Sequence, residues 1–90
     1  AASAEEGPRL PKIDFATFIL SLNSSALVQL GLLEDPSSGQ KAKNLPLAKQ
    51  TIDIIGLLEE KTRGNLSRDE EHMLRSILYD LRMLYVKEKG

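Results

Sequence analysis

The stretch FATFILSLNSSALVQLGLL, from Phe15 to Leu33, contains no Lys, Arg, Asp, Glu or His, although 28% of the whole chain is charged. Its apolar residues recur at helical spacing, which predicts one helix. When successive residues are turned by 100°, the apolar side chains cover more than half of the circumference and small residues fill the remaining sector. The stretch therefore predicts a helix that other helices enclose on more than one side.

The apolar arc of this helix has a centre and two extensions. The centre consists of Phe15, Phe18, Ile19, Leu22, Ala26, Leu30 and Leu33, and the extensions are Ala16, Leu20 and Leu27. Asn23 and Gln29 also project within the arc. If their amides are buried, they need hydrogen-bond partners and can fix one register or stoichiometry. Partial exposure at the edge of a bundle is the alternative, and the sequence leaves both open.

A membrane-spanning helix is the competing interpretation of the uncharged stretch. Such a helix needs about 20 mainly apolar residues. Here six of the nineteen residues are Thr, Ser, Asn or Gln, and Asn23-Ser24-Ser25 lies in the middle. Inserting these polar groups into a bilayer is costly, so we expect no membrane span.

Capping and turn residues divide the chain into a flexible tail (residues 1–13) and one helical domain (residues 14–88). Helices are predicted at about residues 14–31, 45–63 and 67–88. Asp14 suits an N-cap, and Ser67 with Glu70 matches a capping box. Glu34–Asn44 is rich in turn residues, whereas the link at residues 63–66 is short and predicts an antiparallel hairpin of the last two helices. The expected fold is all-α, with three helices, completed by oligomerisation.

The third predicted helix carries apolar residues on two opposite sides. Its core stripe consists of Leu74, Ile77, Leu78, Leu81, Leu84 and Tyr85, and its other side carries Tyr79, Met83 and Val86. On the second helix, the predicted core side consists of Leu47, Ala48, Ile52, Ile54, Ile55 and Leu58, with Leu57 on the opposite side. Three helices cannot cover all of these side chains. Candidate interface residues are therefore Leu20, Leu27, Leu57, Tyr79, Met83 and Val86, with scattered surface apolar residues as the bland alternative.

Composition removes several classes of site. The 90 residues include no Cys and one His, and the net charge is −1, so disulfides and thiolate zinc sites are excluded and no basic footprint for nucleic acid is visible. Asp69 and His72 are three residues apart and could reach one metal ion, but acidic residues in a first helical turn usually serve the helix dipole. We expect no metal and no cofactor. The lysines Lys41, Lys43 and Lys49 are expected to be solvated, and the absence of Cys fits a cytoplasmic location.

No set of acid–base or nucleophilic side chains is grouped in the sequence, so an enzyme is not expected. The function remains unknown at this stage. The favoured hypothesis is a small helical protein that binds itself and acts as an interaction or scaffold module. The alternatives are a monomeric adaptor that binds a partner helix, and a nucleic-acid or ribosome-associated accessory factor that uses the loop lysines.

Three blocks of sequence resemble a known family. These blocks are Phe15–Leu22 (FATFILSL), Leu58–Ser67 (LEEKTRGNLS) and Leu78–Val86 (LYDLRMLYV). They resemble the bacterial family catalogued as domain of unknown function 1844, over about residues 14–87. The resemblance implies a small, helical, cytoplasmic bacterial protein. It implies no activity and supplies no functional residues.

Overall fold

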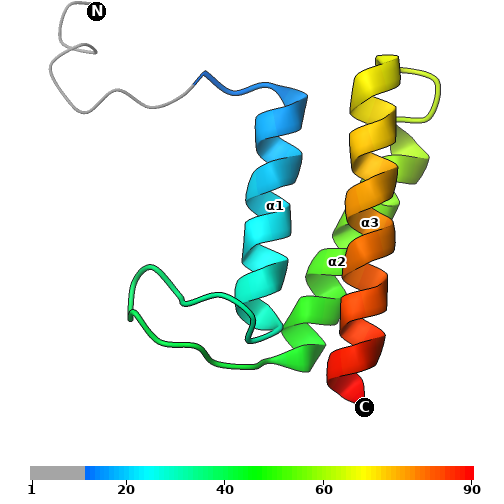
Figure 1. Cartoon of the computed structure of the whole chain (residues 1–90). Coiled ribbons are helices and arrows are strands. Elements are labelled where there is room, and N and C mark those ends of the chain that lie inside the picture. Colours follow the sequence, from blue (N-terminus) through cyan, green and yellow to red (C-terminus); the bar gives the residue numbers. More distant parts are fainter. Residues whose placement is uncertain (1–11) are drawn as a thin grey trace, which may run out of the picture.

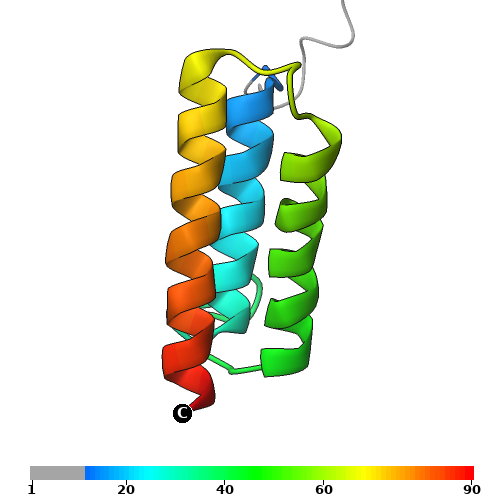
Figure 2. The ribbon, with the colours of Figure 1, turned by 90° about the vertical axis from the view of Figure 1, so that its right-hand side faces the viewer.

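The computed structural model of the chain describes residues 12–90, so most of the predicted tail at residues 1–13 lies outside the described part. It contains three α-helices: α1 (Phe15–Gln29), α2 (Leu45–Lys61) and α3 (Arg68–Lys89). The helices lie side by side in one bundle, with α2 and α3 forming an antiparallel hairpin and α1 packed against both (Figures 1 and 2). The prediction of an all-α fold with three packed helices is confirmed, and completion of the fold by oligomerisation stays a prediction.

Local side-chain chemistry determines where the helices begin. The Asp14 carboxylate accepts a hydrogen bond of 2.8 Å from the Thr17 amide, and this bond lowers the pKa of Asp14. Ser67 and Glu70 form the predicted capping box, in which each side chain accepts from the other residue's amide, at 3.2 and 2.8 Å. Both N-caps satisfy amides that have no partner inside the helix.

The end of α1 lies two residues before the expected position. Gly31 has a φ of +80°, so it stands just beyond the helix rather than inside it. Its amide donates to the Val28 carbonyl at 3.0 Å, and the Leu32 amide donates to the Leu27 carbonyl at 2.9 Å. This pair of bonds is the Schellman arrangement, which favours glycine at the left-handed position.

The two ends of the loop between α1 and α2 lie side by side. Leu30 and Lys43 form an isolated antiparallel bridge, and the Asn44 amide donates to the Gln29 carbonyl at 2.7 Å. A Cβ atom on Gly31 would lie 3.3 Å from the Lys43 Cβ, which is closer than side chains normally pack. The loop is thus closed at its base, and glycine at position 31 is required both by its φ and by this approach.

All three helices contribute to the core. Its buried apolar residues are Ile19, Ala26, Leu30, Ala48, Ile52, Ile55, Leu74, Leu78 and Leu81. Ile19, Ala26 and Leu30 belong to the centre of the predicted arc, and Leu74, Leu78 and Leu81 belong to the predicted stripe on α3, whereas the other members of both sets are partly buried or exposed. The two neighbouring helices therefore cover the middle of the apolar arc of α1 and leave the two edges of that arc open.

Four residues on the predicted apolar sides of the first two helices are partly exposed. Phe18, Leu33, Leu47 and Ile54 are each a little over 40% exposed. Leu33 follows the end of α1 and belongs to the loop. The other three lie at the edges of the apolar sides of their helices. They are partly exposed because the neighbouring helix covers only part of each wide apolar side. A place on an apolar side therefore did not by itself predict burial within the bundle.

Candidate interaction surfaces

The most exposed apolar side chains on the helices lie on the side of α3 that faces away from the bundle. Tyr79 is 65% exposed, Met83 56% and Val86 66%. Spacings of four and three residues place them on one side of α3, opposite the buried residues Leu74 and Leu81. We call these three residues the α3 outer strip.

A second apolar surface lies where α1 meets α2. We define this α1–α2 face by four exposed residues: Phe18, Leu47, Ile54 and Leu57, of which Leu57 lies about 60° farther round α2 than Ile54, away from the core. Thr51 contacts Gln29 of α1, and both Leu47 and Ile54 lie within one turn of Thr51, at the edge of the contact. Phe18 precedes Gln29 by about three turns, so it lies on the same side of α1. The sequence indicated only Leu57 as a candidate interface residue, because the other three lie on the main apolar sides of their helices.

The remaining candidate interface residues behave differently from one another. Leu20 is 50% exposed, on the edge of α1 away from the α1–α2 face. Leu27 is only half-buried, yet it packs against the core. Leu27 is thus already used within the chain, while Leu20, Leu57 and the α3 outer strip have exposed surface to offer. Their role in an interface stays a prediction.

The two polar residues of the apolar arc also differ. The Thr51 hydroxyl donates a 2.6 Å hydrogen bond to the Gln29 side-chain oxygen, and Thr51 is the one polar residue in the described part of the chain that is buried. This bond links α1 to α2. Asn23 is half-buried, and within residues 12–90 its side chain has no hydrogen-bond partner in the protein. Of these two amides, only Gln29 therefore forms a hydrogen bond that could fix how one helix is aligned with another.

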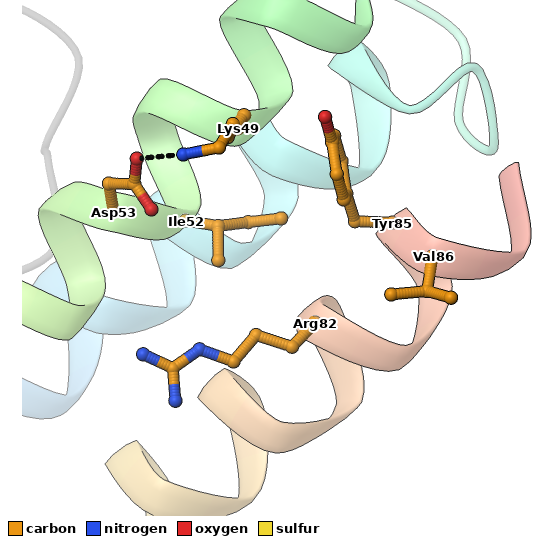
Figure 3. Close-up of a pocket in the computed structure, with 6 residues that line it drawn as sticks. All are labelled: Lys49, Ile52, Asp53, Arg82, Tyr85 and Val86. Atoms are coloured by element: carbon orange, nitrogen blue, oxygen red, sulfur yellow. Dashed lines mark hydrogen bonds and ion pairs between the residues drawn. The ribbon is translucent and has the colours of Figure 1, made fainter. Parts of the chain in front are cut away.

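An open pocket of about 310 Å³ lies between α2 and α3 (Figure 3). Its lining residues are Lys49, Ile52, Asp53, Arg82, Tyr85 and Val86. Lys49 and Asp53 form an ion pair of 2.8 Å, which raises the pKa of Lys49. A Cβ atom on Gly56 would lie 3.1 Å from an Arg82 guanidinium nitrogen, so the arginine lies over α2 where that helix has no side chain.

A second hollow, of about 440 Å³, borders the α3 outer strip on its other side. It is lined by Tyr79, Asp80, Met83, Leu84 and Lys87. The strip is therefore a ridge with a depression and at least one charged residue of each sign on either side. Side chains of a helix lying along this ridge have space to enter.

Two of the three lysines considered for nucleic-acid binding have acidic partners. Lys43 contacts Glu88 at 2.8 Å, and this contact lowers the pKa of Glu88 and joins the base of the loop to the end of α3. Lys49 pairs with Asp53. These contacts neutralise positive charge that a nucleic acid would need.

Within residues 12–90 no three His, Asp or Glu side chains come close enough to hold a metal ion, and Asp69 and His72 gain no third ligand. None of the helices described there has both the length and the apolar character needed to cross a membrane. What the surface offers is apolar area flanked by charge, which suits binding to another protein chain.

The comparisons with known proteins give one match. The model of a family described as a domain of unknown function (DUF1844) matches residues 12–87, which is nearly all of the described part of the chain. No curated protein and no solved structure matches the chain significantly.

Proposed function

Because the chain belongs to the DUF1844 family, whose description names no activity, we propose a function from the surface of the bundle: the protein is a small interaction module that binds a second copy of itself. The observation that carries the proposal is the exposure of Tyr79, Met83 and Val86 on a helix whose other side is already in the core. Side chains of this kind contribute most of their binding energy when a partner removes them from water.

The size of the chain supports this proposal. The core of a domain below about 80 residues rarely supplies more than roughly 3–5 kcal/mol of stability. Association adds stability that grows with the logarithm of protein concentration. Disulfides cannot take its place, because this chain has no cysteine. The α3 outer strip is smaller than the roughly 800 Å² per partner of a standard interface, so we expect weak, reversible association.

Size-exclusion chromatography with light scattering, over a concentration series, tests self-association. The expected result is a mass that rises from one chain towards two as the concentration increases. Replacing Met83 by Glu should hold the protein at the mass of one chain, while Lys61→Glu, an exposed control away from the strip, should leave the rise unchanged. A strictly monomeric protein at high micromolar concentration would contradict the proposal.

The α1–α2 face favours a second candidate, a monomeric adaptor that binds a partner helix. Phe18, Leu47, Ile54 and Leu57 present apolar area separate from α3, and a helix lying in a groove recognises residues at such spacings. Photo-crosslinking from position 57 and from position 79 in the source cell distinguishes the two. A cross-link to a different protein at position 57, with no self-cross-link at position 79, supports the adaptor.

A further inference from the structure

We propose that two copies of the chain pair through the α3 outer strip with their α3 helices antiparallel, across a two-fold axis near the middle of the helix. This inference rests on the proposed self-association and adds its geometry. The strip presents three large apolar side chains on one side of α3, between two open depressions. A second α3 lying along the strip covers these side chains, and its own side chains enter the depressions.

The charges of α3 make its two ends complementary to each other. The first turn holds Asp69, Glu70 and Glu71, and the last turn holds Lys87 and Lys89. A parallel pair of helices would bring acidic turns together at one end and basic turns together at the other. An antiparallel pair brings each acidic turn beside a basic turn, twice, because of the two-fold axis.

The spacing of charges along α3 gives the register of this pair. Asp69 and Lys87 are eighteen residues apart, which is five full turns, so both lie on the same flank of the strip. In an antiparallel pair the same flanks face each other. Asp69 of one copy therefore meets Lys87 of the other when the axis passes beside Leu78, near the centre of the helix.

The other flank agrees with this register. Glu71 and Arg82 are eleven residues apart, about three turns, and face each other across the same axis to within one turn. Glu71 also contacts Arg75 of its own helix at 3.7 Å. In the pair, its carboxylate would therefore lie near two arginines: Arg75 of its own helix and Arg82 of the other copy. Along the strip, Tyr79 meets Ser76 of the other copy, where a small residue leaves room for the ring.

Disulfide trapping tests the direction of the two helices, because the chain contains no cysteine that would interfere. The register places His72 of one copy beside Met83 of the other. In contrast, two copies of His72 lie about 18 Å apart along the helices, from a rise of 1.5 Å per residue. Mixing His72→Cys with Met83→Cys should give the mixed disulfide in excess over either homodimer, as mass spectrometry would show. Leu57→Cys, on the α1–α2 face, is the control and should not cross-link.

Each alternative result of the cross-linking experiment contradicts a specific part of the proposal. Homodimers of His72→Cys together with homodimers of Met83→Cys indicate a parallel pair and overturn this inference. A dimer by light scattering that cross-links only through Leu57→Cys keeps the proposed function but overturns the surface. A chain that stays monomeric overturns both.

Exchange of charges provides a second test that leaves the apolar strip intact. Asp69→Lys and Lys87→Asp should each raise the dissociation constant of the dimer about tenfold, because each substitution acts twice across the axis. The double variant should restore the original constant. Circular dichroism confirms that all three variants fold. If the double variant binds no better than the single variants, Asp69 and Lys87 do not meet and the register is wrong.

Discussion

The base of the loop between α1 and α2 and the α3 outer strip are two regions that use apolar and charged residues in opposite ways. At the loop base, Leu30 is fully buried and Lys43 contacts Glu88, so the chain satisfies its own groups. On the α3 outer strip, by contrast, more than half of the surface of Tyr79, Met83 and Val86 is exposed to solvent rather than packed against the rest of the chain. The difference predicts that substitutions at the loop base alter folding, whereas substitutions on the strip alter association.

The largest predicted difference is in the free energy of unfolding, between the variants Leu30→Ala and Met83→Ala. Removing the buried Leu30 side chain leaves a cavity and should lower the free energy of unfolding by about 2–4 kcal/mol. Met83→Ala should change it by less than about 0.5 kcal/mol at concentrations where the protein is monomeric. Urea unfolding followed by circular dichroism measures both. A similar loss for the two variants would remove the distinction between the regions.

A smaller effect is expected from Gly31→Ala, with Gly39→Ala as the matched control. Both glycines have positive φ, +80° and +70°, so an alanine is strained at either position. Only Gly31 also approaches another residue, Lys43. Gly31→Ala should cost about 1–2 kcal/mol of stability and Gly39→Ala somewhat less, about 1 kcal/mol. Equal losses in thermal unfolding would show that the approach to Lys43 contributes nothing.

The hydrogen bond between Gln29 and Thr51 should contribute about 1 kcal/mol. Thr51→Val keeps the shape of the side chain and removes the donor, while Gln29→Met removes the acceptor. A double-mutant cycle isolates the pair: the double variant should lose less stability than the sum of the two single variants. Strict additivity would mean that the bond does not hold α1 to α2.

The smallest effect concerns pH at the loop base. Lys43 lowers the pKa of Glu88, so this contact favours the folded state above the pKa that Glu88 has in the unfolded chain. The contribution is lost as the pH falls through the lowered pKa of the folded state. NMR titration of the Glu88 carboxyl should show this lowered pKa, and Lys43→Gln should return it to its ordinary value. An unchanged pKa in Lys43→Gln would assign the shift to another group.

Sequence reasoning predicts the local features of this fold better than the contacts between helices. The Asp14 cap and the Ser67–Glu70 capping box depend on residues three apart, so the sequence alone indicates them. The partner of Gln29 is twenty-two residues away on another helix, and no local pattern names Thr51.

The surface shows the same limit. Helical spacing placed Leu57 and the α3 outer strip on outward sides, but it placed Phe18 and Ile54 on the main apolar sides of their helices, among residues that are buried. The direction of a side chain follows from residue spacing. Its burial depends on how far round the helix the neighbouring helix makes contact. Three of the four residues that define the α1–α2 face are therefore identified only once the three helices are packed.

The closed base of the α1–α2 loop makes its tip a site for inserting foreign sequence. The Asn44–Gln29 hydrogen bond and the bridge between Leu30 and Lys43 already hold the two ends together. Ser37 and Ser38 of the loop are exposed, and the loop as a whole projects from the bundle (Figure 1). Lengthening such a loop adds only slowly to its closure entropy, about 0.6 kcal/mol for each doubling. A fluorescent reporter or an affinity tag placed between these two serines would leave all three helices and the α3 outer strip free, which gives the protein a point of attachment in its middle.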